Sequence, residues 1–132
     1  MRWTFTAEGR APSQARALAR AFAAEAGADA ETLAAVALCV SEAVSNAVVH
    51  AYRESESPGP VEVVAERPDG YLFLLVRDHG CGIEPRVDSP GLGLGFPLIA
   101  ESASAVEVRT PGDGGTEVRM RFDLHASAHR AA

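Results

Sequence analysis

Apolar and polar side chains alternate with a period of two in four of the five predicted strand segments, and the remaining segment, residues 71–77, is apolar at almost every position. In each segment every second position is apolar, as in a strand that buries one face and exposes the other. The segments are residues 2–7, 61–66, 71–77, 106–108 and 118–122. Residues 67–70 link the second segment to the third and residues 111–115 link the last two, and both links have the Gly, Pro and Asp typical of tight turns. We therefore predict two hairpins.

Three other segments have apolar residues at helical spacing. The first predicted helix starts at Pro12-Ser13 and ends before Gly27. We expect it to bury a stripe of Leu18, Ala21, Phe22 and Ala26. The second starts after the capping residue Asp29 and ends near Tyr52 or Arg53. Its apolar stripe consists of Leu33, Val36, Ala37, Val40, Val44, Ala47, Val48 and Ala51. A short third helix is predicted at residues 96–103.

The predicted order is strand, helix, helix, strand, strand, loop, helix, strand, strand. Strands joined by tight turns pair antiparallel. We therefore predict an α+β fold, a two-layer sandwich in which a mostly antiparallel sheet of about five strands is covered on one face by three helices. Because 132 residues leave room for one compact domain, we expect a domain at residues 1–124 and a flexible C-terminal tail at residues 125–132.

Composition excludes several function classes. The chain has 12 Lys+Arg against 18 Asp+Glu, a net charge of −6, and no basic cluster, so we expect no nucleic-acid partner. No stretch reads as a membrane span of roughly 20 apolar residues or as a signal sequence, so we expect no membrane and a cytoplasmic location. Cys39 and Cys81 fit no disulfide or zinc pattern and are expected to be free thiols.

Glu42 and Asn46 are the first candidates for chemistry. They are four residues apart in the second predicted helix, so they share a face that points away from the Val40/Val44 stripe. A solvated helix face is the ordinary interpretation of such a pair. However, the positions four residues before and after Glu42 hold no Lys or Arg. An unneutralised carboxylate beside an amide is a candidate general base and Mg²⁺ ligand.

Residues 78–82, Asp-His-Gly-Cys-Gly, follow directly on an apolar strand. Such a sequence is often only a tight turn whose Asp accepts backbone N–H groups. In a binding site, Asp78 would accept a hydrogen bond from an exocyclic amine. Gly80 and Gly82 would let a flat ring approach the backbone.

Gly91, Gly93 and Gly95 precede the third predicted helix. Their N–H groups and the helix N-terminus are suited to holding phosphates, although glycines in a loop also serve flexibility alone. Gly115-Thr116, at the start of the last strand, is a weaker signal, because Thr116 is more often a β-branched sheet residue than a ligand contact.

Taken in order, these motifs resemble those of one known superfamily. The set comprises Glu42/Asn46 on a helix, Asp78/Gly80/Gly82 after a strand, Gly91/Gly93/Gly95 before a helix and Gly115/Thr116 on a strand. It resembles the GHKL ATPase superfamily with its Bergerat-type ATP-binding fold. Residues 41–52 and the small size of the chain resemble the bacterial anti-sigma-factor serine-protein kinases.

The resemblance implies a role for each site residue. Asn46 would bind the Mg²⁺ that bridges the ATP phosphates, and Glu42 would be the general base for a Ser or Thr hydroxyl. Asp78 would select adenine with help from Thr116, and residues 83–95 would form a lid over the triphosphate. The implied partners are a sigma factor and an anti-sigma-factor antagonist of the STAS type, and the resemblance allows a homodimer.

Two other functions compete with this ATP-dependent kinase. The predicted lid is short, contains Pro85 and Pro90 and offers only Arg86 as a cation, which favours a nucleotide-gated binding module without phosphotransfer. A histidine kinase would need a phosphoacceptor helix upstream, and only residues 1–9 precede the first predicted helix, so we do not expect this activity.

Overall fold

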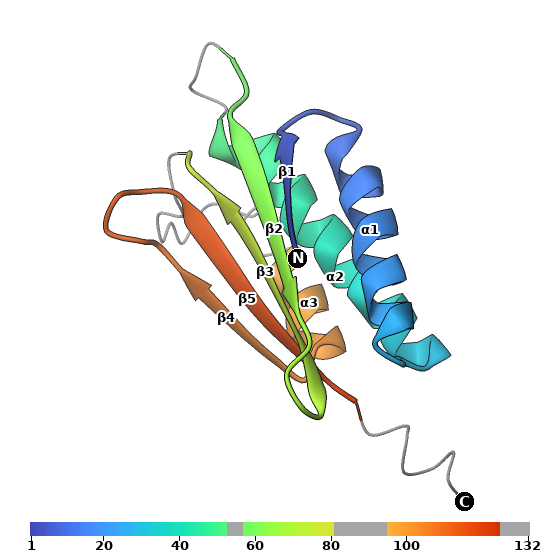
Figure 1. The fold of residues 1–132 in the computed structure, drawn as a ribbon. Helices are drawn as coiled ribbons and strands as arrows, with labels where there is room; N and C mark the ends of the chain where they lie inside the picture. Colours follow the sequence, from blue (N-terminus) through green and yellow to red (C-terminus); the bar gives the residue numbers. More distant parts are fainter. Residues whose placement is uncertain (53–56, 81–94, 125–132) are drawn as a thin grey trace, which may run out of the picture.

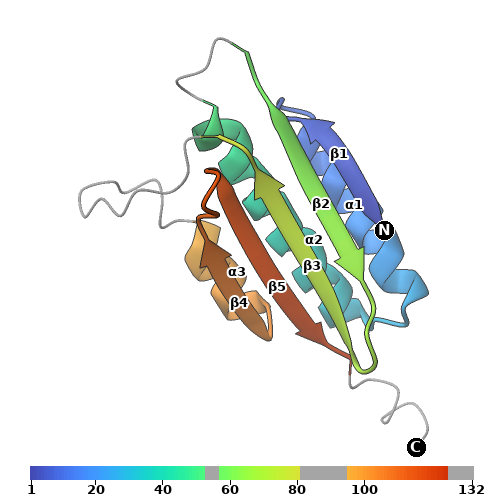
Figure 2. The ribbon, with the colours of Figure 1, turned by 60° about the vertical axis from the view of Figure 1, so that its left-hand side comes forward.

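The computed structural model describes residues 1–52, 57–80 and 95–124, and these form two layers (Figure 1). One layer is a sheet of five strands in the order β1-β2-β3-β5-β4, and every pairing in it is antiparallel. The helices lie together on one face of this sheet (Figures 1 and 2). The predicted α+β sandwich, with its five strands and three helices, is therefore confirmed.

The elements follow the predicted order. The strands are β1 (Arg2–Thr6), β2 (Pro60–Glu66), β3 (Tyr71–Asp78), β4 (Ala105–Arg109) and β5 (Thr116–Asp123). The helices are α1 (Ala11–Glu25), α2 (Ala30–Asn46), the π-helix η1 (Ala47–Ala51) and α3 (Gly95–Ser102).

The register of the sheet aligns the inward residues of its central strands. Leu74 of β3 lies opposite Ala65 of β2 and Met120 of β5, and all three are buried. Each large apolar side chain buried in this way contributes roughly 1.5–3 kcal/mol. Asp78 lies four residues after Leu74 on β3, so its side chain points to the same, buried face of the sheet. This row of core residues therefore ends in a carboxylate.

The buried face of α1 differs from the prediction. Its buried residues are Ala11, Ala15, Ala19 and Ala23, whereas Leu18 is 40% exposed and Ala21 is exposed. Of the predicted stripe, Phe22 is half-buried and packs edge-on against Trp3 at a ring distance of 6.3 Å, and Ala26 is half-buried. Alanines four residues apart form a flat face that lets α1 lie close to its neighbours, and a search for bulky residues overlooks such a face.

The second predicted helix is interrupted by a change of winding. Asp29 caps it as predicted, because its carboxylate accepts the N–H of Thr32 at 2.8 Å. The α-helix ends at Asn46, and residues 47–51 continue as the π-helix η1. Single π turns of this kind are frequent at functional sites.

The segment Ala30–Ala51 is more apolar than we expected of any stretch of this sequence. The segment has 22 residues, and an 18-residue window within it has a mean hydropathy of 1.7, which is enough for a membrane span by length and composition, so the expectation that no stretch approaches one was wrong. In the fold, Val36, Val40 and Val44 of this segment are fully buried in the hydrophobic core. The apolar composition is accounted for by this core position.

Candidate functional site

Asp78 occupies the end of β3, where it is buried with 6% exposure. It lies directly opposite Thr116, the first residue of β5, which is 8% exposed. The Oδ1 atom of Asp78 accepts the backbone N–H groups of Gly80 at 3.0 Å and Thr116 at 3.2 Å. The carboxylate is therefore held in one orientation by the first residue of β5 and by the backbone just after β3.

Burial raises the pKa of Asp78. The N–H groups of Gly80 and Thr116, and the nearby His79 and Arg77, lower it by less. A carboxylate kept in a desolvated position is costly unless it serves a polar ligand, and such groups mark functional sites.

Two glycines allow the backbone to pack tightly around Asp78. A Cβ atom at Gly80 would collide with the carbonyl group of Ala51, the last residue of η1. Gly115 has φ +84°, and a Cβ there would collide with the carbonyl oxygen of Asp78. The protein itself thus requires glycine at both positions, whether or not a flat ring approaches Gly80.

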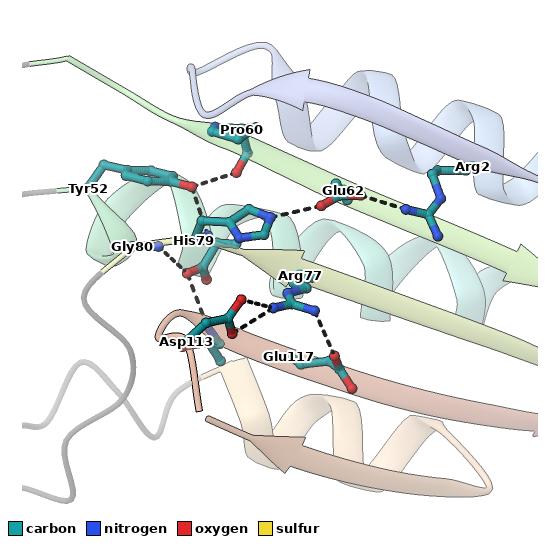
Figure 3. Close-up of polar contacts among 11 residues, drawn as sticks. Arg2, Tyr52, Pro60, Glu62, Arg77, His79, Gly80, Asp113 and Glu117 are labelled. Atoms are coloured by element: carbon teal, nitrogen blue, oxygen red, sulfur yellow. Dashed lines mark hydrogen bonds and ion pairs between the residues drawn. The ribbon is translucent and has the colours of Figure 1, made fainter. Parts of the chain in front are cut away.

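A network of polar contacts surrounds the end of β3 (Figure 3). The Tyr52 hydroxyl donates to the carbonyl oxygen of Pro60 at 2.6 Å and accepts the backbone N–H of His79 at 2.9 Å. His79 Nε2 lies 2.8 Å from Glu62 Oε1, and this contact lowers the pKa of Glu62. Glu62 Oε2 in turn accepts from Arg2 at 2.9 Å. Tyr52 was not predicted as a site residue, because an aromatic residue at a helix end ordinarily indicates packing.

Asn46 is the last residue of α2 and lies directly before η1. It is half-buried, and its Nδ2 atom is buried without a hydrogen-bond partner among the described residues. Such an atom costs about 1–3 kcal/mol if nothing binds it. Because an Asn amide offers donors on one side and an acceptor on the other, it suits a phosphate oxygen or a metal ion.

Glu42 lies one turn before Asn46 on α2 and is half-buried. Its carboxylate makes no hydrogen bond or ion pair within residues 1–52, 57–80 and 95–124. Its charge adds to the effect of burial on Cys39, and together they raise the pKa of that thiol to about 12. Glu42 is thus an available proton acceptor on the same helix as Asn46.

The remaining predicted site residues are only partly covered. Gly95 is the first residue of α3, as expected for a residue at a helix N-terminus. Gly82, Gly91 and Gly93 lie outside the described residues, as do Cys81 and residues 83–94 of the predicted lid. The predicted tail, residues 125–132, also lies outside them.

The site offers few metal ligands of its own. In the described part of the chain, no group of three or more His, Cys, Asp or Glu side chains could hold a metal ion. Mg²⁺ typically takes one or two protein ligands and completes its shell with water and substrate phosphates. Asn46 fits that kind of site and does not fit a metal centre built from protein ligands alone.

Solved structures with a similar fold include a histidine kinase domain. The structure of the RsbU and RsbW domains of Rv1364c from Mycobacterium tuberculosis has a TM-score of 0.72 at 27% identity, and the match covers 94% of this chain and 31% of that chain. The histidine kinase domain of the Erythrobacter litoralis EL346 blue-light activated histidine kinase has a TM-score of 0.61 at 26% identity, covering 86% of this chain and 60% of that one.

A third structure shows the fold alone. The SiaB–SiaC complex from Pseudomonas aeruginosa has a TM-score of 0.58 at 15% identity, and the match covers 94% of this chain and 89% of that chain. No curated protein sequence matches this chain. The model of the histidine kinase-like ATPase domain family matches residues 5–122 of this chain. The fold of the chain and the resemblance of its motifs to the GHKL superfamily agree with that match. The chain belongs to the histidine kinase-like ATPase domain family.

Proposed function

We propose that the chain binds ATP with the adenine ring at the end of β3. The observation that carries this proposal is the buried Asp78 carboxylate, held by the N–H groups of Gly80 and Thr116. A carboxylate accepts from the amino group of adenine and would face the carbonyl oxygen of guanine unfavourably. Thr116 would assist directly or through water, and Gly80 and Gly82 would lie beside the ring.

At the other end of the nucleotide, Asn46 would hold Mg²⁺ through its amide oxygen. The Nδ2 atom of the same amide, buried without a partner among the described residues, would donate to a phosphate oxygen beside that ion, which supports a place for Asn46 at the phosphates. When bound, Mg²⁺ would neutralise charge on the triphosphate. Gly91, Gly93 and Gly95 would surround the phosphates in a lid of residues 83–95.

Glu42 would act as the general base of a serine/threonine-protein kinase. It would accept the proton of a Ser or Thr hydroxyl while the hydroxyl oxygen attacks the γ-phosphorus of ATP, and ADP would leave. Its position one turn before Asn46, without an ion pair among the described residues, supports this role.

The substrate would be an anti-sigma-factor antagonist of the STAS type, and the unphosphorylated antagonist would compete with a sigma factor for this chain. The match to a chain that contains RsbU and RsbW domains supports a regulatory role of this kind. The second candidate is a nucleotide-gated binding module without phosphotransfer, and the two prolines of the predicted lid favour it.

Two measurements test the proposal. Titration with ADP and GDP should give tighter binding of ADP, and the preference should disappear in Asp78→Asn, since its amide offers only one acceptor oxygen. Equal affinities in the wild type would remove the role of Asp78. Incubation with γ-labelled ATP and candidate STAS proteins should then label a partner on Ser or Thr. Nucleotide binding without any labelling would establish the binding module instead.

A further inference from the structure

Tyr52 joins three segments that are far apart in the sequence. It directly follows η1, donates to Pro60 at the start of β2 and accepts the N–H of His79 just after β3. Figure 3 shows its hydroxyl between these two backbone groups. Its ring also fills the place that a side chain at Gly59 would need.

The backbone that Tyr52 holds is the backbone that carries Asp78. His79 lies between Asp78 and Gly80, and the N–H of Gly80 is one of the two that hold the Asp78 carboxylate. The hydrogen bond of 2.9 Å from the His79 N–H to the Tyr52 hydroxyl therefore fixes the peptide group between Asp78 and His79. The side chain of His79 is fixed as well, because it contacts Glu62 of β2 at 2.8 Å.

The contacts among Ala51, Tyr52 and residues 79–80, here called the junction, connect Asp78 to the helix that carries Asn46. Ala51 and Tyr52 lie at the end of η1, which continues directly from Asn46. The carbonyl group of Ala51 occupies the space beside Gly80, so η1 and the segment after β3 cannot shift independently. Burial raises the pKa of Tyr52, which keeps the phenol protonated and able to donate at neutral pH.

We propose that Tyr52 is a positioning residue for nucleotide specificity, which sets the place of Asp78 relative to Asn46. The inference rests on the proposed binding of adenine by Asp78. Tyr52 itself touches backbone atoms of Pro60 and His79 and acts on the nucleotide through them.

Tyr52→Phe tests this role, because it keeps the ring beside Gly59 and removes both hydrogen bonds. We expect ADP to bind about 5- to 20-fold more weakly, as the loss of well-placed hydrogen bonds implies. The affinity for GDP, measured by competition, should change less than about 2-fold, because guanine gains nothing from a well-placed Asp78. A residue that only stabilises the fold would alter both affinities by the same factor.

Tyr71→Phe is the matched control. Tyr71 lies at the opposite end of β3, and its ring packs 4.1 Å from the guanidinium of Arg121. The same hydroxyl deletion there should leave both affinities within about 2-fold of the wild type. Unchanged ADP affinity in Tyr52→Phe, or an equal loss for ADP and GDP, overturns the inference. Failure of the wild type to bind ADP would instead overturn the proposed function.

Amide hydrogen exchange of the wild type gives a second test that does not require Tyr52→Phe to fold. If the junction and the nucleotide stabilise each other, ADP should slow exchange at the His79 amide at least about 5-fold. An ADP complex with unchanged exchange at His79 would contradict the role of Tyr52.

Discussion

Asp78 and Thr116 face each other across β3 and β5, and the Asp78 carboxylate accepts the backbone N–H of Thr116 at 3.2 Å. This bond places a buried negative charge at the point where the row of core residues in the sheet ends. Because Asp78 belongs to β3 and its carboxylate is bonded to β5, its position depends on the register of the sheet. The stability of the fold and the binding of a ligand should therefore both depend on its protonation.

The first prediction concerns pH. Burial raises the pKa of Asp78 above its ordinary value of 3.8, so the folded chain binds this proton more tightly than the unfolded chain. The stability that this group contributes is therefore full below the unfolded pKa and is lost as the pH rises through the raised value. Relative to Asp78→Asn, the wild type should lose free energy of unfolding as the pH rises from the ordinary value of 3.8 through the raised pKa.

Urea denaturation of both proteins across this pH range provides the measurement. The difference between them isolates Asp78, because the other titrating groups are common to both. Parallel curves would show that Asp78 is not desolvated. ADP affinity should change in the opposite direction and fall as the pH decreases through the same value, because a protonated carboxyl is a poorer acceptor.

The second prediction concerns the contact between Gly80 and Ala51. Gly80→Ala should destabilise the fold by about 1–3 kcal/mol, because the added methyl group meets backbone rather than a movable side chain. Gly112→Ala is the control, since nothing lies within 4 Å of a Cβ built there. Thermal unfolding should separate the two variants clearly. Similar melting temperatures would mean that η1 and the segment after β3 are not packed as described.

The third prediction concerns Cys39, a buried free thiol whose Sγ lies 3.9 Å from the carbonyl oxygen of Ile99. Burial, with the charge of Glu42, raises its pKa from 9.0 to about 12. At pH 8 it should therefore hold about 1,000-fold less thiolate than an ordinary cysteine. In a Cys81→Ser background, a disulfide reagent should modify the thiol only after urea is added. Rapid modification of the folded chain would contradict this burial.

How much the sequence could predict depended on the kind of signal. The strands and the two hairpins were predicted because short apolar patterns and turn residues are local properties, as is the cap at Asp29. The buried face of α1 was not, because Ala15 and Ala19 contribute through the close approach they permit, and only the packed structure shows this. The π turn after Asn46 could not be predicted either, because the apolar spacing of residues 47–51 is the same for an α-helical and a π-helical continuation.

The candidate site was predicted only in part for a similar reason. Asp78 and Thr116 stand in two separate motifs, and without the superfamily resemblance only the register between β3 and β5 would bring them together. Tyr52 was missed because its partners are backbone groups of Pro60 and His79, which have no signature in the sequence. The pairing of Glu42 with Asn46 could be predicted because they lie one turn apart on one helix.

The fourth prediction concerns Asn46. If its amide holds Mg²⁺, Asn46→Ala should abolish the dependence of ATP affinity on Mg²⁺, and the affinity without Mg²⁺ should change much less. The helix should stay folded, because Ala is a good helix former and the Nδ2 atom has no partner among the described residues to lose. Circular dichroism checks the fold, and titration with and without Mg²⁺ checks the role. An unchanged response to Mg²⁺ would remove Asn46 from the metal site.

The last prediction separates Glu42 from Asn46. Glu42→Gln keeps the size of the side chain and removes the proton acceptor, so phosphotransfer to a Ser or Thr should fall by roughly 100- to 10,000-fold. ATP should still bind with an affinity close to that of the wild type, because the role of Glu42 begins only when a hydroxyl is present. Asn46→Ala should lose ATP binding first and phosphotransfer as a consequence, so the two variants differ in which step fails.

Single-turnover phosphotransfer at saturating ATP makes that distinction, since saturation compensates for weak ATP binding and does not replace a base. Full transfer by Glu42→Gln under these conditions would assign the base to another group and would leave Glu42 as a half-buried carboxylate on the polar face of α2.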